Sequence, residues 1–170
     1  MSVFEAERLL FTPATPKPDA TPVIFAFPNE YSVGITSLGY QIVWATLAAR
    51  SDLAVSRLFT DVQETLPAQP ELLGFSLSWE LDYVNIFNLL ESFNIPLRAA
   101  DRAAANSNLI IFGGGPVLTA NPEPFADFFD VILLGDGEFL LDAFIDAYQQ
   151  VRHADRQTKL HHLAQVPGVY

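Results

Sequence analysis

The sequence contains no cysteine among its 170 residues. A chain without thiols can form no disulfide framework, and it can hold no zinc ion or iron–sulfur cluster through cysteines of its own. Basic residues are also few, because nine Lys and Arg stand against twenty Asp and Glu, for a formal net charge of -11. Nucleic acids and anionic membrane surfaces are bound through clustered cations, so this balance argues against both kinds of partner.

Long hydrophobic runs are absent as well. No stretch reaches the roughly 18 apolar residues that are typical of a membrane-spanning helix. The N-terminus has no basic segment followed by an apolar one, which a signal peptide would have. We therefore expect a cytoplasmic protein. Half of the residues are nonetheless hydrophobic and 14 are Phe, which is enough to form the core of one domain.

Short apolar runs alternate along the chain with segments of helical periodicity. The runs are typical of buried parallel strands, which are hydrophobic on both faces. Strands are predicted at residues 23–27, 54–59, 72–76, 109–112 and 131–134, and helices at 36–50, 80–93 and 138–152. The alternation predicts a flavodoxin-like (Rossmann-like) α/β fold, in which a doubly wound parallel five-stranded sheet is the middle layer of an αβα sandwich.

Three segments follow from this pattern. Residues 1–21 are rich in proline and are predicted to form an irregular N-terminal arm, and residues 22–152 form the α/β domain. Residues 153–170 are predicted to be a linker towards a further domain. The linker contains His153, His161 and His162. These histidines have no Cys or paired carboxylates at metal-ligand spacing, so no metal site is expected there.

Glycines and small polar residues follow four of the predicted strands. Ligands of open parallel sheets bind beyond the carboxyl ends of the strands, where glycine lets the backbone turn sharply and approach a bound group. The candidate binding residues therefore lie in the loops after the first, third, fourth and fifth strands: Asn29, Tyr31 and Gly34; Ser76 and Ser78; Gly113, Gly114, Gly115 and Pro116; Gly135, Asp136, Gly137 and Glu138. No catalytic residue is predicted.

Each of these loops also has a purely structural interpretation. Gly34 can close a β–α turn, while Ser78 and Asp136 can cap the helices that follow them. The three glycines at 113–115 can form a flexible turn. Trp79 and the phenylalanines of residues 125–129 are expected in the core rather than against a cofactor. The binding and structural interpretations both stay open at this point.

Six strings of residues together resemble a known family: the N-terminal, cobalamin-binding-like domain of radical S-adenosylmethionine (SAM) iron–sulfur oxidoreductases. The strings are Phe27-Pro-Asn-Glu-Tyr-Ser-Val-Gly34, Gly74-Phe-Ser-Leu-Ser-Trp-Glu-Leu81, Gly114-Gly-Pro116, Asn121-Pro-Glu-Pro124, Ala126-Asp-Phe-Phe-Asp130 and Gly135-Asp-Gly-Glu138. The resemblance covers about residues 23–150.

The resemblance implies a following catalytic domain in the same polypeptide. That domain would carry Cys-x-x-x-Cys-x-x-Cys, which holds a [4Fe–4S] cluster and cleaves S-adenosylmethionine. The present chain would be the non-catalytic domain that covers the active site. Cobalamin-binding members carry Asp-x-His-x-x-Gly in the first loop, where the His coordinates cobalt and the Asp holds the His.

Asn29 and Tyr31 stand at those two positions here. A phenol with a pKa near 10 is a poor cobalt ligand at neutral pH. The resemblance thus leaves three roles for the crevice: base-off cobalamin without a protein ligand, a substrate, or a cover that binds nothing.

Two functions of other classes also remain open. A free-standing flavin- or nucleotide-binding module would bind phosphate through backbone N–H groups at the glycine turns, although none of the four loops contains Lys or Arg. A purely structural interaction domain is favoured by the high Phe content.

Overall fold

The structure, a computed structural model, describes residues 2–170 except for the side chain of Glu138. Five strands form one parallel sheet in the order β2-β1-β3-β4-β5. The strands are β1 (Thr21–Ala26), β2 (Leu53–Leu58), β3 (Leu72–Ser76), β4 (Ile110–Gly114) and β5 (Val131–Ile132). This order is that of a flavodoxin-like doubly wound fold, so the predicted fold class is confirmed.

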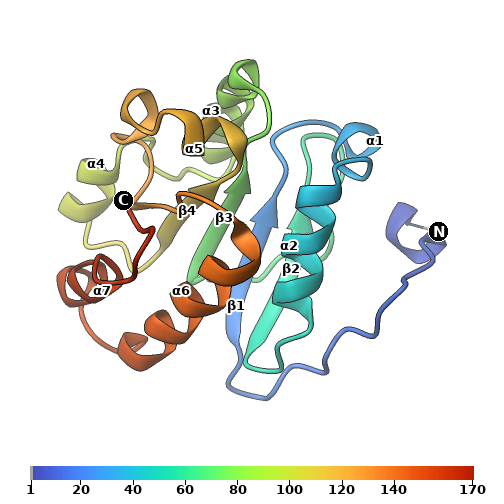
Figure 1. Ribbon diagram of the computed structural model, residues 1–170, viewed down its shortest axis with the longest axis horizontal. Helices are drawn as coiled ribbons and strands as arrows, with labels where there is room; N and C mark the ends of the chain where they lie inside the picture. Colours follow the sequence, from blue (N-terminus) through green and yellow to red (C-terminus); the bar gives the residue numbers. More distant parts are fainter. Residues whose placement is uncertain (1) are drawn as a thin grey trace.

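Helices cover both faces of the sheet (Figure 1). The α-helices are α1 (Tyr31–Gly34), α2 (Leu38–Ala48), α3 (Tyr83–Ser92), α4 (Ala99–Ala104), α5 (Pro116–Ala120), α6 (Gly137–Val151) and α7 (Arg156–Leu163). Three short 3-10 turns are η1 (Val3–Ala6), η2 (Glu80–Asp82) and η3 (Glu123–Phe125). In Figure 1, α2 and α6 lie on one face of the sheet, and α3, α4 and α5 lie on the other. No helix among the described residues has the length and apolar character needed to cross a membrane.

The sheet separates two hydrophobic cores. Side chains of a strand alternate between its faces, so Val23 and Phe25 of β1 pack with α2 and α6, whereas Ile24 and Ala26 pack with α3 and α5. Both faces of the central strands are therefore buried, which explains why their sequences read as continuous apolar runs.

The N-terminal arm runs beside β2 and α2 and is fastened by Arg57 of β2. The Arg57 guanidinium lies 4.6 Å from the ring centroid of Phe4 and 4.0 Å from that of Trp44. It also forms ion pairs with Glu7 at 2.9 Å and Glu64 at 2.8 Å. Burial by itself would lower the pKa of Arg57. The hydrogen bonds and charges of Glu7 and Glu64 outweigh this effect and raise the pKa above its usual value, so the side chain remains a cation.

The segment predicted as a linker packs against the domain. Leu163 of α7 is buried in the core shared by α2 and α6. The last residues then pair antiparallel with β5: Ile132 and Tyr170 exchange two backbone hydrogen bonds of 2.8 Å, and the Leu134 N–H donates to the Gly168 carbonyl. The chain end thus covers the backbone edge of β5, which would otherwise be unpaired.

Several local predictions were wrong. β4 continues through Gly113 and Gly114, so these two glycines belong to the strand rather than to the loop after it. Gly137 is the first residue of α6, and α1 and α5 form within segments predicted as loops. Trp79 is 64% exposed rather than part of the core. Glycine runs and helices of one turn carry little periodic signal, which explains the errors at the glycines and at the short helices.

Candidate functional site

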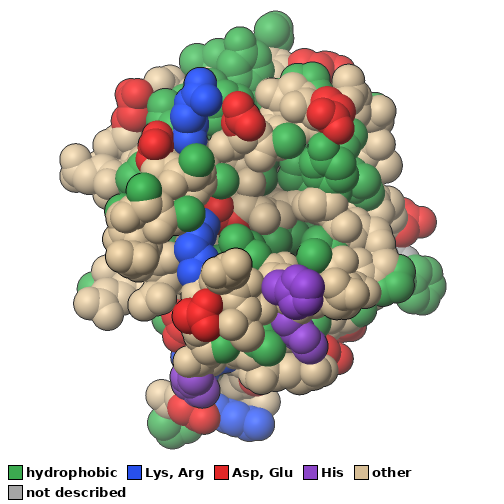
Figure 2. Space-filling model, turned by 90° about the vertical axis from the view of Figure 1, so that its left-hand side faces the viewer, with side chains coloured by type: hydrophobic (Ala, Val, Ile, Leu, Met, Phe, Trp, Pro, Cys, Tyr) green, Lys and Arg blue, Asp and Glu red, His purple; other side chains and the backbone are tan. Residues whose placement is uncertain are grey.

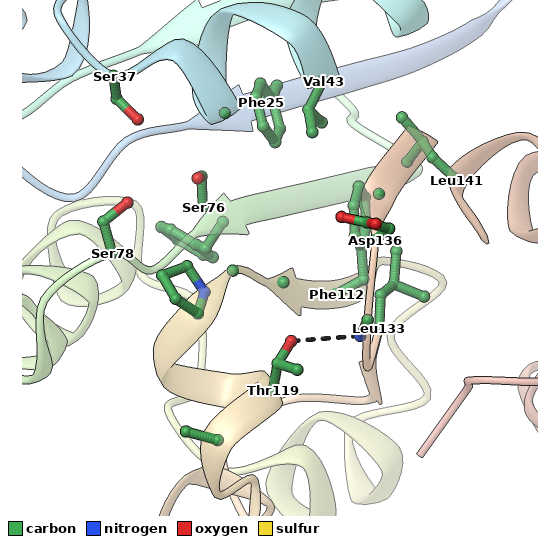
Figure 3. A pocket seen from close by; sticks show the side chains of 18 residues that line it. Phe25, Ser37, Val43, Ser76, Ser78, Phe112, Thr119, Leu133, Asp136 and Leu141 are labelled. Carbon is green, nitrogen blue, oxygen red and sulfur yellow. Dashed lines mark hydrogen bonds between the residues drawn. The ribbon is translucent and has the colours of Figure 1, made fainter. Parts of the chain in front are cut away.

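A pocket of about 600 Å³ lies at the carboxyl edge of the sheet, between the first turns of α2, α5 and α6 (Figure 3). It includes the carboxyl ends of β1 and β3. The chain leaves β1 towards β2 on one side and leaves β3 towards β4 on the other, and such a reversal opens a crevice between the two strands. Most of the lining is apolar, contributed by Phe25, Val43, Phe75, Phe112, Leu133 and Leu141.

Phe25 and Phe112 form an aromatic floor on either side of Gly74 in β3. A Cβ atom at Gly74 would lie 2.3 Å from the Phe112 ring. Gly74 therefore lets this ring lie across the strand beside the pocket. The two phenylalanines were not among the predicted site residues. The sequence placed each phenylalanine near the carboxyl end of a predicted strand, but the register between β1, β3 and β4 decides that the two share one face.

Polar groups are few and uncharged along most of the pocket. Ser37, Ser76, Ser78 and Thr119 contribute hydroxyls, and the Gly135 N–H donates to Thr119 Oγ1 at 3.2 Å (Figure 3). No Lys or Arg is found among the described lining residues. The pocket thus offers hydrogen bonds and apolar contact, but no side-chain cation for a phosphate.

Ser76 and Ser78, two of the predicted binding residues, both line the pocket at the end of β3. Their hydroxyl-bearing side chains lie on the same side of the cavity in Figure 3. The alternative prediction, that Ser78 caps the following helix, was wrong. The N-cap position of η2 is Trp79, and it makes no side-chain cap bond. By contrast, Ser37 does cap α2, since its hydroxyl accepts from the Tyr40 N–H at 3.4 Å.

The three glycines at the end of β4 differ in what they do. Gly114 lines the pocket, and a Cβ atom there would meet its nearest neighbours at 3.8 Å, an ordinary contact. Gly115 also lines the pocket, but its φ of 115° and a Leu77 carbonyl oxygen 2.5 Å from its Cβ position require glycine for the turn itself. Pro116 begins α5 at the pocket wall. Gly113 is buried against Phe129 and Leu118 and does not line the pocket.

The loop after β5 supplies the one acidic side chain among the described lining residues. Gly135 turns the chain with a φ of 116°, and Asp136 occupies the N-cap position of α6 as predicted. The Asp136 carboxylate makes no cap bond, however, and it borders the pocket together with Gly137. Glu138 follows in α6, and its side chain lies outside the described part of the structure.

Asn29, Tyr31 and Gly34 do not line the pocket, so the structure does not bring the first predicted loop together with the other three. Gly34 is a packing position, because a Cβ atom there would lie 2.5 Å from the Phe59 ring. Asn29 donates to Asp82 Oδ1 at 3.0 Å and accepts from the Glu30 N–H at 2.8 Å.

Tyr31 faces the N-terminal arm. Its hydroxyl donates to Glu7 at 2.8 Å, and its ring packs edge-on against Phe4 and Phe59. Burial, together with the Glu7 hydrogen bond and charge, raises the pKa of Tyr31 to about 12. The phenol is therefore protonated at neutral pH and occupied by an internal partner, so in this position it is not a metal ligand.

Asp82 is a polar residue at the same edge that sequence reasoning missed. It is buried beside Asn29, and its Oδ2 atom has no hydrogen-bond partner among the described residues. Burial raises the pKa of this carboxyl, and the Asn29 hydrogen bond partly offsets the rise. Within the described part of the chain, no three His, Asp or Glu side chains gather as metal ligands do.

Fold and site together define a flavodoxin-like α/β domain with an apolar pocket at its strand-order reversal. Residues 63–170 match the family model described as "Radical SAM proteins, N-terminal". This match spans more than half of the chain, so the chain belongs to that family. It includes the loops after β3, β4 and β5, but not the loop that contains Tyr31.

One curated protein is similar to this chain over most of its length. The uncharacterized protein MJ0966 of Methanocaldococcus jannaschii is 28% identical over 116 residues, which is 68% of this chain and 24% of the relative. The chain therefore spans about a quarter of the length of that relative. No solved structure matches the present chain.

Proposed function

We propose that this chain is a non-catalytic N-terminal domain that holds a small organic molecule for the radical SAM domain of the same polypeptide. The observation that carries the proposal is the pocket of about 600 Å³, which has an aromatic floor and no cation among its described lining residues. Such a volume suits one small ligand or one part of a larger ligand. Family membership supports the presence of a radical SAM domain in the same polypeptide.

The lining favours an uncharged, flat ligand group. Phe25 and Phe112 contribute aromatic, apolar surface, while Ser76, Ser78 and Thr119 can donate or accept hydrogen bonds. A phosphate would find hydroxyl and backbone N–H donors but no side-chain cation, and the Asp136 carboxylate borders the same pocket. The lining therefore favours a neutral substrate over a flavin or a nucleotide.

Base-off cobalamin is the second candidate, and the pocket chemistry gives it specific support. An apolar pocket with Ser76 and Ser78 at its mouth fits the aromatic base of the cobalamin tail, and Gly114 leaves room beside it. Cobalamin, when bound, would supply its cobalt centre for chemistry in the catalytic domain. Because Tyr31 is held by Glu7, this chain would hold the cofactor through its tail and would leave the cobalt without a ligand from Tyr31.

The catalytic step itself is assigned to the following domain. There a [4Fe–4S] cluster bound by that domain's own cysteines would cleave S-adenosylmethionine, as expected for an iron–sulfur oxidoreductase of this family. The present chain has no cysteine and contributes binding and orientation.

A thermal-shift and absorbance experiment on the 170-residue chain tests the ligand site. We expect stabilisation by neutral aromatic compounds or retention of hydroxocobalamin after desalting, and no stabilisation by FMN or AMP. Gly114→Leu should abolish either effect. The side chains of residues 112 and 114 share one face of β4, so the added side chain enters the pocket.

Ala104→Leu is the matched control, since it adds the same side chain to the exposed end of α4. If FMN stabilised the unmodified chain and Gly114→Leu removed this effect, the result would favour the flavin-binding module instead. The ligand-binding proposal would be abandoned if no compound in the set bound the unmodified chain.

A further inference from the structure

Four exposed apolar side chains gather at the edge of the sheet that contains the pocket. They are Leu38 (70% exposed), Trp79 (64%), Leu81 (83%) and Phe139 (82%). Leu38 begins α2, Trp79 and Leu81 follow β3, and Phe139 lies in the first turn of α6. Connections from a strand to its following helix start at the carboxyl edge, so all four lie at that edge. We call this set the pocket rim.

Three residues of the pocket rim are close in sequence to residues that line the cavity. Leu38 stands between two lining residues, Ser37 and Gly39. Trp79 directly follows the lining residue Ser78, and Phe139 comes two positions after Gly137. Figure 2 shows hydrophobic side chains gathered at the upper end of the molecule, which is the end where the strand arrows of Figure 1 point.

The opposite edge of the sheet lacks such a cluster. Among the described residues at 49–52, 93–97, 105–109 and 126–130, which lead from helices back to strands, Phe93 is the one large apolar residue that is exposed, at 38%. Large apolar side chains grouped around a pocket are typical of an interaction surface, whereas single ones need no explanation. This difference in exposed apolar residues between the two edges of the sheet therefore indicates a partner at the carboxyl edge.

We propose that the pocket rim docks on the radical SAM domain of the same polypeptide and closes the pocket mouth between the two domains. The inference rests on the proposed function for its partner. The family consists of N-terminal parts of radical SAM proteins, and the relative is about four times as long as the matched segment. Glu80 and Asp136 are exposed beside the rim, so the partner face should be apolar with Lys or Arg at its border.

Closure of the mouth has a chemical consequence. A ligand in the pocket would be shielded from bulk water by the docked domain, and exclusion of water limits side reactions of reactive intermediates. The exposed end of the ligand would then face the partner rather than solvent.

Single cysteines test the docking surface, because the chain has none of its own. Leu38→Cys, Leu81→Cys and Phe139→Cys are labelled with N-ethylmaleimide in the 170-residue chain and in the full polypeptide, and mass spectrometry reads each site. We expect labelling to be about tenfold slower or more at all three sites in the full polypeptide. Leu10→Cys, at a side chain that is 93% exposed in the arm, and Phe93→Cys should label equally in both forms.

Equal rates at the rim in both forms would overturn the proposal. Labelling of the isolated chain that slows as its concentration rises would also overturn it, because a second copy would then cover the rim. Gly114→Leu separates docking from ligand binding. The variant should no longer bind the ligand, whereas the rim cysteines should still be labelled slowly in the full polypeptide. Slow labelling of the rim can therefore support docking even if the ligand proposal fails.

Discussion

Gly39 and Gly74 lie near the same pocket, but their surroundings differ. A Cβ atom at Gly39 would meet no atom within 4 Å, whereas one at Gly74 would lie 2.3 Å from the Phe112 ring. Gly39 therefore borders open space in the pocket, whereas Gly74 serves the packing of the protein itself. The sequence shows a glycine in both cases, and only the neighbours distinguish the two.

Substitution by alanine should separate these roles. Gly39→Ala should stabilise the protein by up to about 1 kcal/mol, because alanine favours the first turn of α2. Gly74→Ala should destabilise it by roughly 1–3 kcal/mol through overpacking against Phe112. Urea unfolding followed by circular dichroism measures both changes. Equal effects of the two substitutions would contradict the assignment.

Tyr31 should make the stability of the protein fall at alkaline pH. Below pH of about 10 the phenol is protonated in the folded and the unfolded chain. Above this value the unfolded chain loses the proton, whereas Tyr31 in the fold keeps it until about pH 12. Deprotonation thus favours the unfolded state, and stability is lost as the pH rises through this window.

Tyr31→Phe should reduce that loss. The measurement is the free energy of unfolding in urea at several values between about pH 9 and 11. Burial also raises the pKa values of Tyr40 and Tyr148, so part of the alkaline loss should remain in the variant. A pH dependence identical to that of the unmodified protein would show that Tyr31 titrates normally.

At the scale of elements, motifs that carry the family resemblance also hold helices and strands together. Asp130 is the last residue of the Ala126–Asp130 string, and its side chain is fully buried between Arg102 of α4 at 3.0 Å and Arg156 of α7. It also accepts from the Ile111 N–H of β4 at 2.8 Å. Glu123 of the Asn-Pro-Glu-Pro string accepts from the Tyr170 hydroxyl at 2.6 Å. These two acidic residues therefore have structural roles.

Asp130→Asn should destabilise the protein by about 3–5 kcal/mol, because it leaves two guanidinium groups without their shared buried carboxylate. Asp127→Asn is the control. Asp127 pairs with Arg98 at 3.5 Å, with both side chains more than 60% exposed, so its loss should cost less than about 1 kcal/mol. Chemical denaturation compares the variants, and similar midpoints would refute the role of Asp130.

At the scale of the whole molecule, the strand order places the pocket. The reversal between β1 and β3 opens the crevice, and the helices that start at the carboxyl edge provide its walls. The same edge carries the pocket rim, so ligand binding and docking would share one surface. The formal charge of -11 adds long-range attraction to any basic partner face.

Most of the fold could be predicted from the sequence. β3 matches its predicted range, and α6 is shifted by one residue from its predicted start and end. Apolar runs and helical periodicity report burial directly, so they identify such elements. The loops after β3, β4 and β5 were also recognised as parts of one edge, because parallel strands end together.

What the sequence by itself determined is the set of elements, the fold class and the edge at which a site can form, since each follows from local hydrophobic pattern and from the rules of parallel sheets. Only the tertiary structure decided which side chains meet there. It turned Tyr31 towards Glu7, used Gly113 and Gly34 for packing, and placed Phe25 and Phe112 on either side of Gly74. These outcomes depend on register and on contacts between residues distant in the chain, which no local pattern encodes.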